Sequence, residues 1–431
     1  MKRLLIASVL CLGITLLSLN GFSFQKFMNP RYNLNLSDLN SNQGNNASLL
    51  FSWGLDQTYR GNKITLDING NIYIMGTKSI AGSFFYPIEA FIVKFDEFGE
   101  EIWNFTKNVE FDNYFNDISV DEEFNVYSFS NTYNDYWSMI KLNSTGNLVW
   151  NHTYKGTAEC IYLDSYKNIY ISGSTFLSKF DEFGTVLWNN SLPVSLGYPK
   201  ILYVDRFNNT YSAGRYYYPS TQQFFYRIYD SFGNVTSNLI QNIELNYFSD
   251  NWFFDNLTSL YIIGSQDNGC CSLFKFNSTG ALTQKINWQT EVFNDYTLGG
   301  CWSDVVVDSD GTIYCAGTNT FWSGESFSEV YLVKFNSSGD LEYDGAWKQR
   351  KSTSLGDLFV DKNNNVYLTG HWEYGVFVVI NPSLGEFSKP GIFYMYIDEE
   401  IILYLSLFFG IWCLLGIILY IKFIKKKHDQ P

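Results

Sequence analysis

The stretch LDINGNIYIMG, residues 66–76, decides the fold because its pattern returns along most of the chain. An apolar segment ends at Asp67, a polar cluster containing Gly70 follows, and a second apolar segment begins at Ile72. Short apolar runs separated by Asp, Asn and Gly are typical of two β-strands joined by a tight turn. Tyr73 stands six residues after the aspartate, and Gly76 stands nine residues after it.

Seven copies of this pattern follow one another. A tyrosine stands six residues after every aspartate, and a glycine stands nine residues after each one except Asp121, where Ser130 takes its place. The aspartates are spaced by 54, 43, 41, 50, 53 and 53 residues and are Asp67, Asp121, Asp164, Asp205, Asp255, Asp308 and Asp361. Spacings of roughly 40 to 50 residues are typical of the blades of a β-propeller.

Each unit contains four apolar segments, which in the first unit are ITLD, NIYIMG, AFIVKF and EEIWNF. An Asx-x-x-Gly turn, such as Asp96 to Gly99, separates the third segment from the fourth. The Asx side chain bonds the nearby backbone, and the glycine supplies a positive φ. We therefore predict an all-β fold over residues 47–388. It is a seven-bladed β-propeller of four-stranded antiparallel blades, in which each blade buries its faces against its neighbours.

A tryptophan predicts how the ring closes. In the first three units a Trp stands four residues after the second-turn glycine, whereas Lys389 stands there in the seventh unit. The segment SLLFSWG, residues 48–54, carries Trp53 but has no unit before it. We predict that this N-terminal strand completes the last blade, so that Trp53 closes the ring and no sheet edge stays open.

The run VDSDGTIYCAGTN…YLVKFNSSG and its six relatives resemble the SBBP β-propeller repeat of secreted and surface proteins, over roughly residues 47–388. This resemblance implies the architecture and leaves the function open, because propellers support unrelated activities. The segment FDEFGEEIW, with Asp96, Gly99 and Trp103, is similar to the tryptophan-docking motif of pyrroloquinoline quinone proteins. That second resemblance implies a distant alternative, a quinoprotein-like redox enzyme.

The N-terminus predicts export. Lys2 and Arg3 precede an apolar run from Leu4 to Leu19 that contains no charge. We interpret residues 1–23 as a signal peptide or as an uncleaved signal anchor, and residues 24–46 as a linker.

The C-terminus predicts a single membrane span. Residues 401–421 form a charge-free run of 21 residues, about 32 Å long as a helix, which is enough to cross a bilayer. Acidic residues end the juxtamembrane tether, residues 389–400, and four lysines lie in the basic tail, residues 422–431. The positive-inside rule therefore places the tail in the cytoplasm and the propeller outside, at the cell membrane.

Charge and composition exclude several functions. The net charge is −14, and the two terminal segments are basic, so the rest of the chain is more acidic still and nucleic acid is not expected as a partner. Of the three histidines, His371 is expected at the surface, and none lies in a pattern typical of a nucleophile or a zinc site. One Asp per turn lacks the alternating oxygen ligands of a calcium loop. We predict no catalytic residues, no metal, no cofactor and no enzymatic activity.

Loop positions predict where a ligand binds. The turns within each unit lie on one face, which we call the turn face, and the longer, variable connections lie on the other, which we call the loop face. Variable loops on a rigid scaffold commonly bind ligands. The candidate ligand-binding residues are aromatic and are Tyr86, Tyr136, Trp137, Tyr217, Phe321, Trp322, Trp372 and Tyr374. The alternative is that these rings pack the gaps between blades.

Five cysteines fall inside the predicted propeller, and the expected compartment is oxidising. A disulfide between Cys271 and Cys301 is feasible, because both are expected on the loop face of adjacent units; a bridge between Cys270 and Cys271 is the alternative. Eleven Asn-x-Ser/Thr sites permit glycosylation.

The sequence thus predicts a membrane-anchored, cell-surface propeller. Its role is a binding or adhesion module for an extracellular protein or glycan, held with the loop face away from the membrane. A structural cell-envelope protein is the alternative, and the oligomeric state is not specified.

Overall fold

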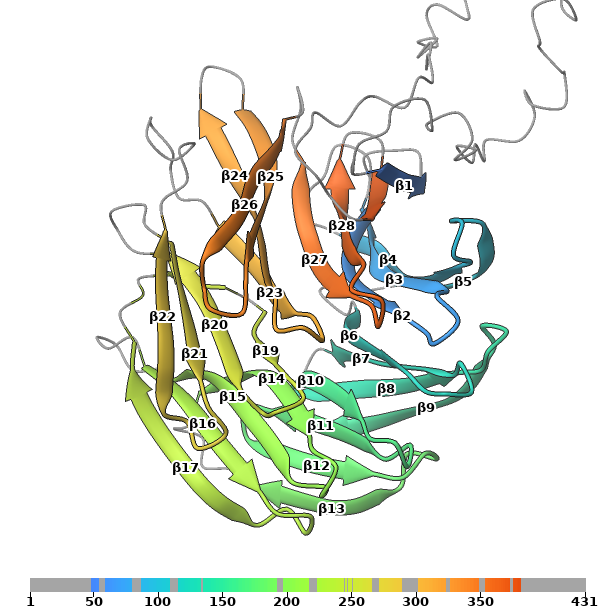
Figure 1. Ribbon diagram of the computed structural model, residues 1–431. Coiled ribbons are helices and arrows are strands. Elements are labelled where there is room, and N and C mark those ends of the chain that lie inside the picture. Colours follow the sequence, from blue (N-terminus) through green and yellow to red (C-terminus); the bar gives the residue numbers. More distant parts are fainter. Residues whose placement is uncertain are drawn as a thin grey trace, which may run out of the picture. The chain divides into compact units, whose positions relative to one another are not determined.

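The structure is a computed structural model. It describes residues 48–380 except 54–58, 80–86, 109–114, 133–134, 192–196, 217–222, 244, 246, 250, 266–270, 289–300, 323–325, 349–352 and 373–374. All regular elements in these residues are β-strands, and they form seven antiparallel sheets, the predicted blades (Figure 1).

Blade 1 contains β2 (Tyr59–Leu66), β3 (Ile72–Ser79), β4 (Pro87–Phe95) and β5 (Glu101–Asn108). Blade 2 contains β6 (Phe115–Val120), β7 (Val126–Thr132), β8 (Tyr136–Leu142) and β9 (Leu148–Lys155). Blade 3 contains β10 (Ala158–Leu163), β11 (Ile169–Gly173), β12 (Phe176–Phe180) and β13 (Val186–Ser191). Blade 4 contains β14 (Tyr198–Val204), β15 (Thr210–Tyr216), β16 (Gln223–Tyr229) and β17 (Val235–Asn242).

In blade 5 the innermost strand is split, so the sheet contains β18 (Tyr247–Phe248), β19 (Phe253–Phe254), β20 (Leu260–Ser265), β21 (Cys271–Phe276) and β22 (Leu282–Trp288). Blade 6 contains β23 (Cys301–Val307), β24 (Ile313–Trp322), β25 (Ser326–Phe335) and β26 (Leu341–Lys348). Blade 7 contains β27 (Ser354–Val360), β28 (Val366–Trp372), β29 (Gly375–Ile380) and β1 (Ser48–Trp53).

The innermost strands form a closed ring. Contacts run from β2 through β6, β10, β14, β19, β23 and β27 and return to β2. Buried apolar clusters fill the gaps between consecutive blades; one of them joins Ile74 of blade 1 to Val378 of blade 7. Each blade is therefore stabilised by both of its neighbours.

The turn after each innermost strand explains the aspartate–tyrosine spacing. Asp67 Oδ1 accepts the backbone N–H groups of Asn69 and Asn71, and its Oδ2 accepts the hydroxyl of Tyr73 at 3.0 Å. The tyrosine–aspartate hydrogen bond is present in all seven blades, at 3.0 to 3.4 Å. A lysine of the third strand, such as Lys94, lies 4.9 Å from the centre of the Tyr73 ring and adds a cation–π contact.

The edge strand of blade 7 comes from the N-terminal side of the propeller, as the sequence predicts. β1 pairs antiparallel with β29, and Trp53 lies opposite Val376. The Trp53 indole N–H donates to Glu101 Oε2 at 2.9 Å, and its ring packs against Tyr59 and Phe91. Trp53 thus joins the last blade to the first.

The other repeated tryptophans join consecutive blades. The Trp103 ring covers Gly146 in the second turn of blade 2, and its N–H donates to the Ser144 carbonyl at 3.0 Å. A Cβ at Gly146 would lie 2.7 Å from this ring, so glycine is required there by contact as well as by its φ of +80°. Trp188 covers Gly233 of blade 4 in the same way.

In the part of the chain that the structure describes, no helix is long and apolar enough to cross a membrane. The signal segment, residues 1–23, and the predicted span, residues 401–421, lie outside that part, so the C-terminal transmembrane helix stays a prediction.

Candidate functional site

The innermost strands share a β-bulge that directs side chains toward the centre of the ring. In six blades the pairing of the innermost strand skips one residue, five residues before the turn aspartate. A bulge bends its strand and changes the direction of the next side chain. The residues that follow the bulges are Lys63, Asp117, Cys160, Ile201, Asp304 and Asp357.

Three of these residues are carboxylates that reach the next blade. Asp117 Oδ2 accepts the backbone N–H of Ile161 at 3.2 Å, and Asp304 Oδ2 accepts that of Leu358 at 2.8 Å. Asp357 Oδ2 accepts the backbone N–H of Ile64 at 2.9 Å, which crosses from blade 7 to blade 1. The buried carboxylates thus fasten neighbouring blades to each other.

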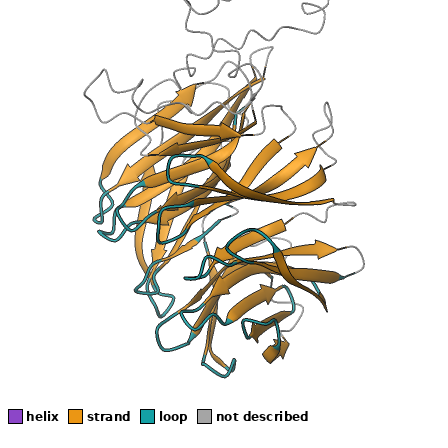
Figure 2. Cartoon of the chain, turned by 90° about the vertical axis from the view of Figure 1, so that its right-hand side faces the viewer, coloured by secondary structure: helices purple, strands orange, loops and turns teal. Residues whose placement is uncertain are grey.

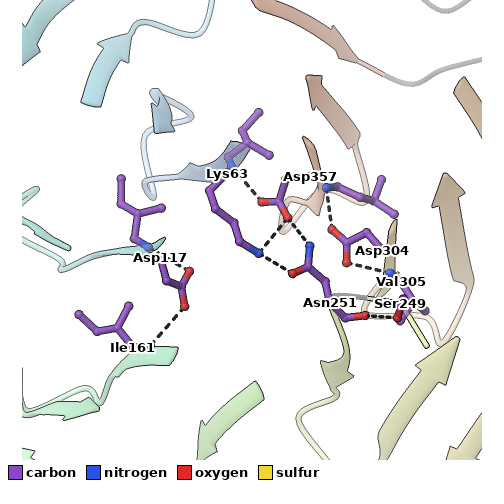
Figure 3. A network of polar contacts seen from close by, with 11 residues as sticks. Lys63, Asp117, Ile161, Ser249, Asn251, Asp304, Val305 and Asp357 are labelled. Carbon is purple, nitrogen blue, oxygen red and sulfur yellow. Dashed lines mark hydrogen bonds and ion pairs between the residues drawn. The ribbon is translucent and has the colours of Figure 1, made fainter. Parts of the chain in front are cut away.

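Lys63 and Asn251 complete the central network (Figure 3). The Lys63 ammonium donates to Asn251 Oδ1 at 2.8 Å and to Asp357 Oδ1 at 3.3 Å. The Asn251 amide donates to the same Asp357 oxygen at 3.2 Å. Blades 1, 5 and 7 therefore meet at one carboxylate.

The charges of this network are set by burial and by each other. Burial lowers the pKa of Lys63, but Asp357, Asp117 and Asp304 raise it above its ordinary value, so the amine is an ammonium and not a nucleophile. Burial raises the pKa of Asp117, and burial together with the neighbouring Asp357 raises the pKa of Asp304 well above the ordinary value. Asp304 is therefore easier to protonate in the folded protein than an ordinary aspartate.

Small cavities of about 210 and 330 Å³ adjoin the network, and both are lined by Lys63, Asp117, Cys160, Lys200 and Asn251. Within the described residues, no group of three or more His, Cys, Asp or Glu side chains is arranged to hold a metal ion. The Asp357 carboxylate, the Lys63 ammonium and the Asn251 amide bond one another, and Asp117 and Asp304 bond backbone N–H groups of neighbouring blades. The centre is therefore best explained as a structural network that holds the blades together.

A larger groove lies between blades 2 and 3. β11 and β12 have five residues each, the shortest middle strands of any blade, and only Ser174 and Thr175 join them. β9 of blade 2 has eight residues and extends past this short hairpin. The groove is about 570 Å³ in volume. It begins at the Ser174–Thr175 connection on the loop face, where the two blades differ in length, and continues along β12 and β13 to Phe180 and Val186.

Aromatic rings form one wall of the groove. The Trp137 ring lies between Tyr154 and Phe176, with ring centres 4.6 and 5.8 Å apart and interplanar angles of 28° and 11°. Burial and then Asp181 raise the pKa of Tyr154 to about 12, so its hydroxyl is neutral and donates to the Gly184 carbonyl at 2.7 Å. The stack is therefore rigid.

Polar groups form the rest of the lining. Lys155 and Asp135 are exposed and carry opposite charges, and hydroxyl and amide groups surround them. Asp135 has a φ of 59°, and its carbonyl accepts the Gly156 N–H at 2.6 Å, which fixes the rim of the groove. The remaining polar lining residues are Thr157, Ser174, Thr175, Ser178, Asn189 and Ser191.

The predicted ligand-binding aromatics are placed as follows. Tyr136 is 45 % exposed beside the groove, but Trp137 is 1 % exposed because successive residues of β8 point to opposite faces. Trp137 therefore packs between blades; for the loop aromatics, such packing was the alternative to ligand binding. Phe321 and Trp322 lie in β24 and Trp372 lies in β28, so those strands run further than expected, and their side chains are not described. Tyr86, Tyr217 and Tyr374 lie outside the described residues.

The cysteines and His371 lie away from the groove. Cys271 and Cys315 are buried in the apolar cluster between blades 5 and 6. Cys301 begins β23, its side chain is not described, and the Cys271–Cys301 disulfide stays a prediction. His371 was expected at the surface, but it lies in β28 and is partly buried; burial and then Arg60 lower its pKa to about 4.

Comparison with known protein families matches one segment of the chain. Residues 50–77 match the family described as a β-propeller repeat, SBBP. No curated protein matches the chain in sequence.

Solved structures show distant likenesses. A protein of unknown function from Bacteroides caccae is 12 % identical, covers 56 % of this chain and 86 % of its own, and has a TM-score of 0.39. A member of the duf4221 family from Bacteroides vulgatus is 10 % identical, covers 63 % and 94 %, and has a TM-score of 0.39. BBS1N in complex with ARL6DN is 8 % identical, covers 79 % and 98 %, and has a TM-score of 0.47. Function is therefore argued from the residues of this chain.

Proposed function

We propose that this seven-bladed propeller is a cell-surface binding module, anchored by the predicted span at residues 401–421, and that its ligand occupies the groove between blades 2 and 3. The groove is the observation that carries the proposal. Its volume of about 570 Å³ falls in the range of ligand sites, roughly 300 to 1,000 Å³.

The lining favours a glycan over a protein surface. Phe176 and Val186 supply apolar area, while Lys155, Asp135 and Asn189 supply charges and hydrogen-bonding groups in the same small volume. A sugar ring has apolar C–H faces and hydroxyl edges, which match such a mixture. A protein partner commonly buries about 800 Å² on each side, more than one groove of this size offers.

The scaffold supports binding by holding the groove in one shape. The Tyr154–Trp137–Phe176 stack and the ring of blades fix the walls before any ligand arrives. A preformed site loses less conformational entropy on binding.

The experiment is a glycan array probed with the purified full chain. Lys155→Ala and Thr175→Ala change the lining without removing a packed ring, and we expect each to weaken binding of a captured glycan several-fold. Thr312→Ala, in a turn of blade 6 on the turn face, is the matched control and should bind like the unmutated chain. Unchanged binding in both groove variants would exclude the groove as the site.

A further inference from the structure

The turn face carries large apolar side chains at the tips of its turns. In the turns between the third and fourth strands of blades 1, 3 and 4, Phe98 is 60 % exposed, Phe183 is 65 % exposed and Phe232 is 79 % exposed. The turns between the first and second strands add further exposed side chains. We call the whole set the apolar tips: Ile68, Phe98, Tyr166, Phe183, Phe207, Phe232 and Leu257.

The turns do not need these side chains. In blade 3 the turn is held by Asp181, which accepts the Phe183 N–H at 2.9 Å, and by Gly184, whose φ is +81°. The Phe183 side chain contributes nothing to either feature. Blades 2, 5 and 6 build the same turn with Thr145, Thr279 and Ser338 at the corresponding position. A single exposed apolar residue is ordinary, but repeated placement at one face indicates an interaction surface.

Five of the seven apolar tips lie in the consecutive blades 3, 4 and 5, and two lie in blade 1; blade 2, which stands between blades 1 and 3, has Glu123 and Thr145 at its two turns. Blades 6 and 7 have Asp310 and Asn363 two residues after the turn aspartate. Figure 2 shows the described turns, in teal, at one end of the strands.

Both ends of the described chain lie at this face. β29 ends at Ile380, opposite Ser48, the first residue of β1. Ile380 also lies opposite Tyr367, which follows the turn of Asp361. The apolar segments of the sequence, residues 4–19 and 401–421, are therefore connected to the propeller through its turn face.

We propose that the apolar tips insert into the interface of the lipid bilayer that carries the protein, so that the turn face rests on the membrane. This inference rests on the proposed membrane anchoring. Aromatic rings partition favourably into the interface, and seven tips on one rigid scaffold act together. Glu97 and Glu182 flank Phe98 and Phe183, and the net charge is −14, so neutral phosphatidylcholine is the matching lipid and anionic lipid is not.

The experiment places an environment-sensitive thiol probe on the full chain in phosphatidylcholine vesicles that contain a lipid-borne quencher. Phe232→Cys and Phe183→Cys carry the probe at apolar tips; Ser337→Cys, on a polar tip, and Thr175→Cys, on the loop face, are the controls. Labelling of the unmutated chain gives the background from its own thiols. We expect quenching at positions 232 and 183 to exceed that at 175 several-fold.

Vesicle flotation distinguishes a failure of the tip insertion from a failure of the membrane anchoring on which it rests. If the chain floats with the vesicles and the probe at 232 is quenched no more than the probe at 175, the insertion of the tips is wrong while the anchoring stands. If the chain does not float, both are wrong. Crosslinking between copies through position 232, with no quenching, would overturn the inference and identify the apolar tips as a contact between two copies of this chain.

Discussion

The ammonium of Lys63 lies 2.8 Å from the side-chain oxygen of Asn251, although 188 residues separate them in sequence. The same ammonium meets Asp357, which bonds the backbone of blade 1. A few buried polar side chains thus fasten the first, fifth and seventh blades across the centre of the ring.

Replacing this ammonium tests the fastening. The side chain of Asp357 is 9 % exposed, and Lys63→Met leaves this buried carboxylate without its cation. Removing one member of a buried pair is strongly destabilising; since the Lys63 side chain is 23 % exposed, we expect a loss of roughly 2 to 4 kcal/mol in the free energy of unfolding, measured by denaturant titration. Lys155→Met, at an exposed lysine, is the control, and an equally small effect in both variants would argue against a structural role for the centre.

The raised pKa of Asp304 predicts that its contribution to folding stability decreases as the pH rises. Its pKa is raised in the folded protein by burial and by Asp357, so folding favours its protonated form. The stability that Asp304 contributes is present when the pH is below the ordinary pKa of an aspartate. It is lost as the pH rises from that pKa to the raised pKa of the folded state. Asp304→Asn removes the titrating group, so we expect the pH-dependent loss of stability to be smaller in this variant. A steeper fall in stability with rising pH in the variant would show that the direction is wrong.

The lowered pKa of His371 predicts the opposite, namely that its contribution to folding stability decreases as the pH falls. Burial and Arg60 lower its pKa to about 4, so the folded state favours the neutral imidazole. The stability that it contributes is present above the ordinary pKa of about 6.5 and is lost as the pH falls from there to about 4. His371→Gln cannot be protonated. We expect its melting temperature to fall less than that of the unmutated chain between pH 7 and pH 4. If the melting temperatures of both chains fall equally over this range, His371 does not cause the pH dependence.

The repeated residues predicted the fold because each has a local task. Asp67 caps its turn, Tyr73 bonds Asp67, and Gly146 admits the ring of Trp103. The spacing of such residues is therefore fixed in every blade, and it can be read without knowing which blades touch. Trp53 could be placed by the same reasoning, because it ends a unit that has no beginning.

The central network was missed although its signal is present. Asp117, Asp304 and Asp357 each stand four residues before a turn aspartate, a D-x-x-x-D spacing that occurs in three units only. Their partners are backbone N–H groups of other blades, which have no sequence signature. The groove was missed for a related reason: it results from the difference in length between β9 and the pair β11 and β12, and not from any motif.

From the sequence, no function was assigned to the turn face, because its turn chemistry is complete without further residues. That same completeness makes Phe98, Phe183 and Phe232 informative, since no local role accounts for them. A residue that a repeat does not require, at a position that the repeat exposes, is a candidate for function.

Trp53 provides the last prediction, which concerns ring closure. Trp53 lies in the edge strand of blade 7, donates to Glu101 of blade 1 and packs against Phe91, so one side chain joins the two ends of the ring. Trp53→Asp removes the aromatic packing and places a carboxylate near Glu101. Replacing a large packed aromatic by a small residue costs about 3 to 5 kcal/mol, and the like charge adds to that cost.

Because the blades depend on each other, the loss should spread beyond blade 7. Hydrogen exchange should quicken in β29 and in β2 together, while Glu101→Gln, which keeps an acceptor for the indole, should stay close to the unmutated chain. Exchange that quickens in β1 alone would mean that β1 is an appendage and that the ring closes without it.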